Sequence, residues 1–353
     1  MKKKLFSSIK DIIKDAKNGK MFILVDDKNR ENEGDLVIPA SKCNSQKINF
    51  MAKHGRGLIC LALTPQKVKK LNLPLMSMVN KSRTQTAFTV SIEAKKGIST
   101  GISAKDRAKT IKVAINPSST KKNIVSPGHV FPLVAKSGGV LERAGHTEAS
   151  VDISKLAKVN PSAVICEVMN EDGTMARYKD LILFAKKHKL KIGKIEDLIS
   201  HRLKTERHIK NTSNKKINIK NFGSFELKIF KNKLDNSENY AIIKGKFNKN
   251  KPYRVRVISS NILSNILNLN KNIFKNSIKY LNKFSNFALI LVKNVNLTSN
   301  SSDSNKILRY YGIGAQIIKE LNIKKMILVS RSKKRIIALK GYNLQITKQE
   351  IIK

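Results

Sequence analysis

Short apolar runs alternate with polar segments along the first 209 residues, and their spacing predicts both helices and strands. Apolar residues between 7 and 18 recur with the helical period, which predicts a basic amphipathic helix. Uninterrupted runs of aliphatic and β-branched residues are typical of buried strands. Such runs stand at 21–25, 36–40, 57–63, 86–94 and 163–169, and a closing helix is predicted at 195–210. Mixed strands and helices favour a layered α/β domain.

The second half of the chain is richer in Asn and Lys but keeps a similar alternation. The polar segment NTSNKK at 211–216 is predicted to be a linker. Because 353 residues are enough for two ordinary cores, we expect two domains, at 1–209 and 217–353. In the second domain, strands are predicted at 225–230, 240–247, 288–295 and 325–330, and a helix at 312–323.

The formal net charge of +45 raises the question of a polyanionic partner. The basic residues are spread along the chain, because 40 of them stand in the first 209 residues and 30 in the remaining 144. There is no Trp, and neither zinc-finger spacing nor an aromatic nucleic-acid motif occurs. Nucleic-acid binding therefore stays a minor alternative, and we expect the positive field to attract small anionic substrates too.

The three cysteines, Cys43, Cys60 and Cys166, form no CxxC pair, so neither a disulfide framework nor a structural zinc site is predicted. We interpret them as small buried hydrophobic residues. The longest apolar runs are too short to span a bilayer, and the basic N-terminal segment lacks an apolar signal core. We therefore expect a cytoplasmic protein without a membrane partner.

An acidic segment, DDKNRENEGD at 26–35, holds five of the 25 acids of this basic chain. If the backbone is extended there, the side chains of Glu31, Glu33 and Asp35 share one face. Carboxylate oxygens gathered in this way suit Mg²⁺ or Mn²⁺. Arg30 within the segment fits a site that holds an anion beside the metal. The alternative interpretation is a solvated turn.

A glycine-containing turn around His146 combines several groups that bind phosphates and metals. Arg143 precedes the histidine, Gly145 frees the backbone, and Thr147 and Glu148 follow. Backbone N–H groups, a guanidinium and a hydroxyl can bind a phosphate together, while the imidazole ligates a metal. The alternative is a structural histidine, which is the interpretation we adopt for His54.

Two further residues are candidates for proton transfer. His129 lies between Pro127 and Pro132, which predicts a stiff loop that positions an acid or base. Glu167 ends an apolar run, where an ionised carboxylate is costly unless it is paired or tuned to carry a proton. An outward-facing strand residue is the alternative for Glu167.

Six motifs occur in order along the first domain, namely DDKNRENEGDLVIPA, TAFTVSIEA, GISTGISAKDRAKTI, SPGHVFPL, GGVLERAGHTEASVD and VICEVMNEDGTMAR. Together they closely resemble the 3,4-dihydroxy-2-butanone 4-phosphate synthase family over residues 5–207. The resemblance implies a three-layer mixed-sheet domain of the α/β, or α+β-like, class. It also implies a lyase that converts D-ribulose 5-phosphate to 3,4-dihydroxy-2-butanone 4-phosphate and formate in riboflavin biosynthesis.

The resemblance further implies roles for the candidate residues. Glu31 and His146 would ligate Mg²⁺ or Mn²⁺, with two ions per site, and no zinc is expected. Asp35, His129 and Glu167 would carry catalysis, although which of them handles each proton stays open. Substrate contacts are implied for Arg30, Glu31, Asp35, Arg143, Ala144, Gly145, His146, Thr147 and Glu167. Because family members are homodimers, we expect a homodimer here.

The segment at 309–346 resembles the end of GTP cyclohydrolase II, which implies a smaller α/β domain of that type. That enzyme needs three zinc-binding cysteines, and no cysteine follows Cys166. We therefore predict that the second domain has lost the cyclohydrolase activity. Two alternatives remain, namely a bifunctional enzyme that still opens GTP and a synthase whose basic tail is a binding module.

Overall fold

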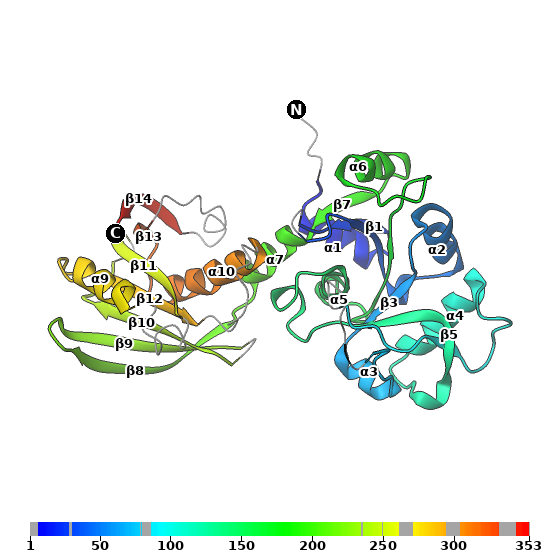
Figure 1. Cartoon of the computed structure of the whole chain (residues 1–353), viewed down its shortest axis with the longest axis horizontal. Coiled ribbons are helices and arrows are strands. Elements are labelled where there is room, and N and C mark those ends of the chain that lie inside the picture. Colours follow the sequence, from blue (N-terminus) through cyan, green and yellow to red (C-terminus); the bar gives the residue numbers. More distant parts are fainter. Residues whose placement is uncertain are drawn as a thin grey trace. The chain divides into compact units, whose positions relative to one another are not determined.

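The chain forms two compact units, Met1–Ile199 and Ser200–Lys353, each built on its own seven-stranded sheet (Figure 1). A computed structural model describes residues 6–27, 30–77, 79, 86–233, 236–248, 250–260, 271–293, 304–331 and 344–352.

The first unit alternates strands and helices, as the apolar pattern predicts. Its strands are β1 (Phe22–Val25), β2 (Gly34–Pro39), β3 (Cys60–Leu63), β4 (Ile92–Ala94), β5 (Ile124–Val134), β6 (Ala163–Glu167) and β7 (Lys191–Lys194). Its α-helices are α1 (Ile9–Lys17), α2 (Ser45–Phe50), α3 (Pro65–Leu71), α4 (Ala104–Ile115), α5 (His146–Leu156), α6 (Tyr178–Lys187) and α7 (Ile195–Thr205), the last of which continues into the second unit. Short helices of other types are η1 (Ala40–Lys42), η2 (Met51–Gly55), η3 (Lys121–Asn123) and η4 (Gly139–Leu141).

The sheet of this unit is mixed and has the order β4-β5-β3-β6-β2-β1-β7. On one face, Leu36 and Ile38 of β2 belong to a core that includes Ile48 of α2 and Ile111 of α4. On the other face, α5 packs against β2, β3 and β6, and α1 packs beside α5. The predicted three-layer α/β architecture is confirmed, and the central strands β2 and β6 lie side by side within it.

The predicted loop around His129 is wrong, because these residues lie within the long strand β5. Proline is tolerated in a strand where its missing N–H faces no partner. Val130 and Leu133 supply the buried positions that hold β5 in the sheet. The predicted strand at 86–94 is shorter than expected, with only Ile92–Ala94 forming β4.

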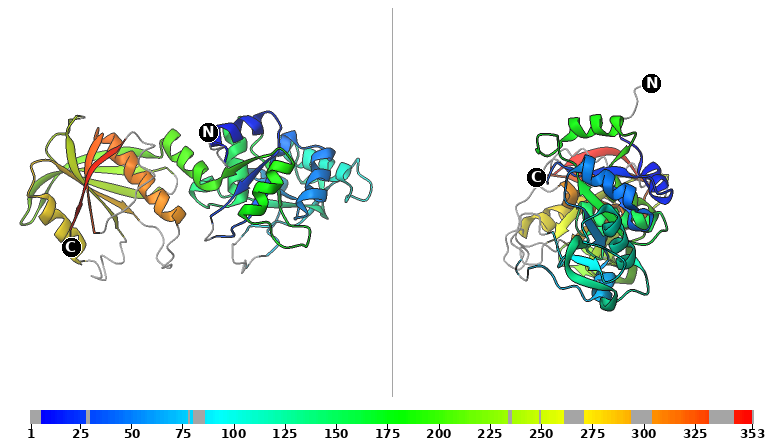
Figure 2. Two further views of the ribbon diagram at one scale, coloured as in Figure 1. Left: turned by 90° about the horizontal axis from the view of Figure 1, so that it is seen from above. Right: turned by 90° about the vertical axis from the view of Figure 1, so that its right-hand side faces the viewer.

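The second unit contains β8 (Ile209–Ile219), β9 (Gly223–Asn232), β10 (Glu238–Lys244), β11 (Pro252–Ser260), β12 (Phe287–Lys293), β13 (Lys325–Ser330) and β14 (Gln345–Ile351). Their order in the sheet is β14-β13-β11-β12-β10-β9-β8. Both α9 (Lys271–Leu281) and α10 (Ser304–Glu320) pack against β12 (Figure 2). Ile258 packs in the core with α9, whereas its neighbour Val257 contacts Gly314 of α10, so the two helices cover opposite faces.

The predicted linker at 211–216 is wrong, because these residues form the middle of β8. The strand is the last of its sheet and pairs only with β9 among the strands that the structure describes. Most of its side chains are exposed. A polar sequence is compatible with such an edge strand, so composition alone could not separate it from a loop.

Candidate active site

In the part of the acidic segment that the structure describes, residues 26–27 and 30–33 lie between the antiparallel strands β1 and β2, and 34–35 begin β2. The carboxylate of Asp26, whose side chain is fully buried, accepts hydrogen bonds from the backbone N–H groups of Glu31 at 3.1 Å and Glu33 at 3.0 Å. It also accepts one from Arg30 at 2.9 Å. Asn32 has a φ of 56°, so the backbone is not extended over the whole of 31–35. Asp26 therefore curls the loop, and sequence reasoning assigned it no role.

Glu31 and His146 meet in this site although they are far apart in the sequence. The Nδ1 atom of His146, the first residue of α5, lies 3.8 Å from Oε2 of Glu31 and 3.7 Å from Oδ1 of Asp35. Asp26, Glu31 and His146 each offer one ligand atom, and these atoms lie within 4.8 Å of one another. The three side chains form the site that we call the acidic cluster.

The donor set of the acidic cluster fits a divalent metal. Within the part of the chain that the structure describes, the buried Nε2 atom of His146 has no hydrogen-bond partner. The other ring nitrogen, Nδ1, faces Glu31 and Asp35 but lies beyond hydrogen-bond distance of both, at 3.8 and 3.7 Å, which leaves it able to bind a metal ion between them. The carboxylate oxygens suit Mg²⁺ or Mn²⁺, and the imidazole adds one nitrogen ligand to them.

The titration of the cluster shows how strongly its charges interact. Burial opposes ionisation of Glu31, but His146 and Arg30 outweigh it and lower the pKa of Glu31 to about 2. Burial also opposes the charge of His146, but Asp35 and Glu31 raise its pKa to about 9. Burial raises the pKa of Asp35 to about 7, and the nearby Glu167 adds to the rise against the opposing charge of His146. The carboxylates therefore favour a positive charge among them, which a divalent metal can supply when His146 gives up its proton.

Glu167 lies directly opposite Asp35, because the two are paired in the antiparallel register of β6 and β2. Its Oε2 atom accepts a hydrogen bond of 2.9 Å from the backbone N–H of Leu58. Gly57 lies against it so closely that a Cβ atom there would be 2.6 Å from both the carbonyl oxygen and Oε2 of Glu167. The backbone of 57–58 therefore fixes this carboxylate, as expected for a positioned acid or base.

The predicted phosphate-binding turn leads into α5, next to the acidic cluster. Gly145 is the N-cap, and His146 and Thr147 are the first two residues of the helix. Arg143 donates to Glu148 at 2.7 Å and to Oγ1 of Thr86 at 3.0 Å. Because the first N–H groups of a helix and its dipole favour anions, this turn can bind a phosphate beside the metal. Ala144, like His146 and Thr147, is buried.

His129 is not part of the acidic cluster within this chain. Its Nδ1 atom contacts Glu93, and 44% of its side chain is exposed. When the registers of β3 with β5 and with β6 are continued by two residues, His129 and Glu167 lie at the same level of the sheet, both opposite Leu58. With β3 between them, their backbones are about 10 Å apart.

Arg177 is a second residue that sequence reasoning missed. It lies at the N-cap of α6 and donates to the carbonyl oxygens of Glu31 at 2.7 Å and Asn32 at 2.9 Å. It also pairs with the carboxylate of Glu33 at 3.4 Å. The motif GTMAR around Arg177 is the one signal that could have identified it.

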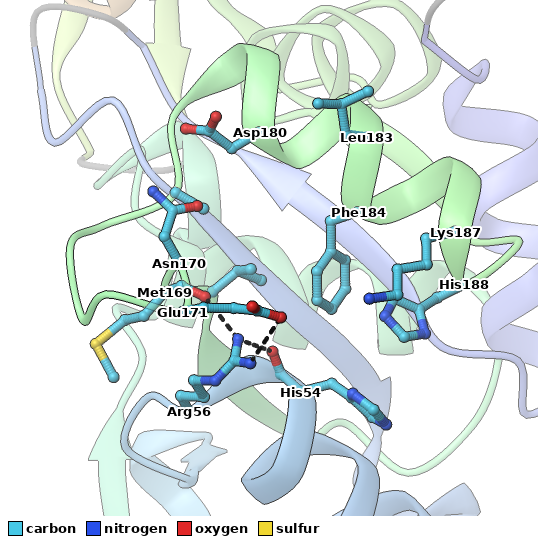
Figure 3. Close-up of a pocket in the computed structure, with 12 residues that line it drawn as sticks. His54, Arg56, Met169, Asn170, Glu171, Asp180, Leu183, Phe184, Lys187 and His188 are labelled. Carbon is cyan, nitrogen blue, oxygen red and sulfur yellow. Dashed lines mark hydrogen bonds and ion pairs between the residues drawn. The ribbon is translucent and has the colours of Figure 1, made fainter.

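A cavity of about 250 Å³ lies beside this region, next to the end of β6 (Figure 3). None of the predicted site residues lines it; its walls include Arg56, Glu171 and the rings of His54, Phe184 and His188. The ring of His54 packs against His188 with 4.7 Å between centroids, which supports the structural interpretation of His54.

No helix in the described part of the chain is long and apolar enough to cross a membrane.

Comparison with known proteins gives one family for each unit. The 3,4-dihydroxy-2-butanone 4-phosphate synthase family matches residues 10–201, and the GTP cyclohydrolase II family matches residues 210–279 and 274–350. A curated 3,4-dihydroxy-2-butanone 4-phosphate synthase from Photobacterium phosphoreum is 42% identical over 96% of this chain and 98% of its own length. The riboflavin biosynthesis protein RibBA of Aquifex aeolicus (strain VF5) is 40% identical over 99% and 93%.

Solved structures that match this chain include members of the first of these families. RibBX, a two-domain 3,4-dihydroxy-2-butanone 4-phosphate synthase from A. baumannii, matches with a TM-score of 0.86 and 40% identity over 98% of this chain and 100% of its own. A 3,4-dihydroxy-2-butanone 4-phosphate synthase in complex with two magnesium ions matches with a TM-score of 0.54 and 40% identity. That match covers 57% of this chain and 98% of the other.

Proposed function

We propose that Glu31 and His146 bind a divalent metal in this chain, which belongs to the 3,4-dihydroxy-2-butanone 4-phosphate synthase family. The chain converts ribulose 5-phosphate to 3,4-dihydroxy-2-butanone 4-phosphate and formate in riboflavin biosynthesis, and this reaction uses the metal. The observation that carries the proposal is the convergence of three ligand atoms, from Asp26, Glu31 and His146, within 4.8 Å of one another. We propose Mg²⁺ or Mn²⁺, with two ions per site, because a relative is known in complex with two magnesium ions.

The test is the variant Glu31→Gln, which keeps the size of the side chain and removes its charge. Formate release should fall to background and Mg²⁺ binding measured by calorimetry should be lost, while the circular dichroism spectrum stays that of the wild type. Glu171→Gln is the matched control, because the carboxylate of Glu171 is 84% exposed and pairs only weakly with Arg56 at 3.6 Å. Normal turnover by Glu31→Gln would refute the assignment.

The protein groups around the cluster have distinct tasks in this proposal. When bound, a divalent cation makes the C–H next to the ketone of the substrate more acidic. Asp35 and Glu167 face each other across β2 and β6, where they can accept and return the protons that the rearrangement moves. A carboxyl group whose pKa is about 7, such as Asp35, is matched to both directions of transfer near neutral pH. Arg30, which pairs with Glu31, orients the substrate beside them.

The turn from Arg143 to Thr147 binds the phosphate of the substrate in this proposal. Its support is the position of the helix N-terminus, since Thr147 and the imidazole of His146 belong to the same first turn of α5. The phosphate and the metal-binding end of the substrate would thereby be held by one rigid segment. Positioning of this kind is a large part of catalysis by proximity.

We also propose a homodimer in which His129 acts in the site of the partner subunit. The support is its exposure and its distance from Glu167 within one chain. Exposed large apolar side chains on segments near β4 and β5, as expected for an interface, are Leu75, Met76, Val79, Ile102 and Val125.

Co-expression of His129→Asn with Glu31→Gln tests this arrangement. Each variant alone should be inactive, whereas mixed dimers regain one intact site, which gives about a quarter of wild-type activity for random pairing. Sedimentation should show a dimer. A mixture as inactive as its components would place His129 in the site of its own chain.

For the second unit we propose a GTP cyclohydrolase II-like domain without that activity, because no cysteine follows Cys166. The purified protein should contain no stoichiometric zinc and should release no formate from GTP. Zinc together with turnover of GTP would establish the bifunctional alternative. A cytoplasmic location, which suits a sugar phosphate substrate, stays a proposal.

A further inference from the structure

We propose that Glu148 is a positioning residue that holds the guanidinium of Arg143 in the orientation that the phosphate of the substrate requires. The inference rests on the proposed function, because it takes the turn of Arg143 as the phosphate site. Glu148 would not touch the substrate and would act through Arg143 alone.

The contacts of Glu148 join three segments of the chain. It is the third residue of α5, and its side chain is 1% exposed. One carboxylate oxygen accepts a hydrogen bond of 2.7 Å from Nη1 of Arg143, and the other accepts one of 3.1 Å from the backbone N–H of Lys136. A charged hydrogen bond to a buried carboxylate is stronger and better defined than one at the surface.

Neighbouring residues complete the fixation of Arg143. Nη2 of Arg143 donates to Oγ1 of Thr86 at 3.0 Å, so its guanidinium is held by two different segments. A Cβ atom at Gly145 would lie 2.3 Å from Nη1 of Arg143 and 2.8 Å from Oε2 of Glu148. The glycine thus leaves the space in which the guanidinium and the carboxylate meet. Arg, Gly and Glu of the sequence RAGHTE act as one unit in this interpretation.

Two effects of Glu148 on phosphate binding oppose each other. Its negative charge competes with the phosphate for Arg143, whereas its hydrogen bond removes rotamer freedom that Arg143 would otherwise lose on binding. Ordering a long side chain costs up to about tenfold in affinity. Because Lys136 and α5 fix the carboxylate in a buried position, we infer that the ordering effect is the larger one.

A double-mutant cycle tests whether Glu148 acts through Arg143. Formate release is measured for the wild type, Glu148→Gln, Arg143→Met and the double variant. Glu148→Gln should raise KM for ribulose 5-phosphate about tenfold with kcat within about twofold. In the Arg143→Met background the same substitution should change KM by less than about twofold, because the residue through which it acts is gone. Glu142→Gln, an exposed neighbour, is the control and should keep the wild-type KM.

Binding of inorganic phosphate, measured by calorimetry, gives a readout that needs no turnover. Its Kd should follow the same pattern across the four proteins. If the wild type bound phosphate in this pattern but released no formate, the proposed function would fail and the role of Glu148 would stand.

Several results would overturn the role of Glu148. An equal effect of Glu148→Gln in both backgrounds would show that it acts independently of Arg143. Tighter phosphate binding would show that it is only a competing charge. If the buried substitution unfolds the protein, Thr86→Val removes the other anchor of Arg143. That variant should raise KM several-fold in the wild-type background and leave it unchanged in Arg143→Met, and any other pattern would contradict the proposal.

Discussion

The packing of Gly57 against Glu167 predicts that one added methyl group should disable the enzyme. In Gly57→Ala the new Cβ would lie 2.6 Å from the carbonyl oxygen and Oε2 of Glu167 and 2.7 Å from its nitrogen. Ordinary contacts begin near 3.4 Å, so Glu167 and residues 57–58 must move apart by about 0.8 Å. The hydrogen bond of 2.9 Å from Leu58 to Glu167 would be strained or lost with this movement.

A misplacement of about 1 Å in a catalytic group can cost about 100-fold in rate, so kcat of Gly57→Ala should fall by roughly that factor. Overpacking should also lower stability by about 1–3 kcal/mol. The assay is formate release at saturating ribulose 5-phosphate and Mg²⁺, with thermal unfolding followed by circular dichroism to show that the variant is folded.

Gly55→Ala is the matched control for this prediction. Its Cβ would lie 3.0 Å from Sγ of Cys166, 3.1 Å from Cδ1 of Leu36 and 3.3 Å from the carbonyl oxygen of Glu167, so its neighbours need to shift by only a few tenths of an ångström and the Glu167 carboxylate is not touched. We expect kcat within about fivefold of the wild type for this variant. A Gly57→Ala enzyme with normal kcat would show that the position of the Glu167 carboxylate does not limit the reaction.

Three further predictions concern the loop, the fold and the metal. Arg177→Met removes the donor to the carbonyl oxygens of Glu31 and Asn32, so Mg²⁺ binding should weaken about 10–100-fold while the melting temperature changes little. An unchanged affinity for Mg²⁺ would show that Arg177 does not hold the metal-binding loop in place. Hydrogen bonding, chiefly from Ser99, lowers the pKa of Asp106 below its usual value, so its stabilisation is present above about pH 4 and is lost as the pH falls through the lowered value. The melting temperature of Asp106→Asn should therefore lie below that of the wild type at pH 6, and the gap should narrow as the pH falls below about 4. A gap that stays constant with pH would show that the charge is not responsible. Dialysis against EDTA should abolish formate release, Mg²⁺ or Mn²⁺ should restore it, and Mg²⁺ at 100 times its Kd should stabilise the fold by about 2.7 kcal/mol, whereas full activity in EDTA would exclude a metal requirement.

The sequence predicted the layered architecture because apolar periodicity reports directly which segments are buried. It also predicted that Glu31 and His146 belong to one site, through motifs that carry the family resemblance. It could not show that Asp26 folds the acidic loop, because an acid after a strand has the same local signature whether it binds backbone N–H groups or solvent. The motif GTMAR marks Arg177 as a candidate, but its contact with the carbonyl oxygen of Glu31 depends on tertiary packing between distant segments.

Strand β5 and strand β8 were missed for a related reason. Proline and polar residues favour loops on average, but the neighbours of a strand decide whether they are tolerated. In β5 the buried side chains of Val130 and Leu133 outweigh the prolines, and in β8 the pairing with β9 outweighs the polar composition. Hydrogen bonding between strands depends on the whole sheet, so the sequence of a single strand predicts it only in part.

The polar edge strand β8 has a consequence for the behaviour of the protein at high concentration. Its outer side has no neighbouring strand in the described part of the chain, and a strand of this length could template the addition of foreign strands. Lys210, Lys215 and Lys216 are exposed along it, so an approaching second copy would meet its own positive charges there. The lysines along β8 should therefore oppose strand addition at this edge of the second sheet.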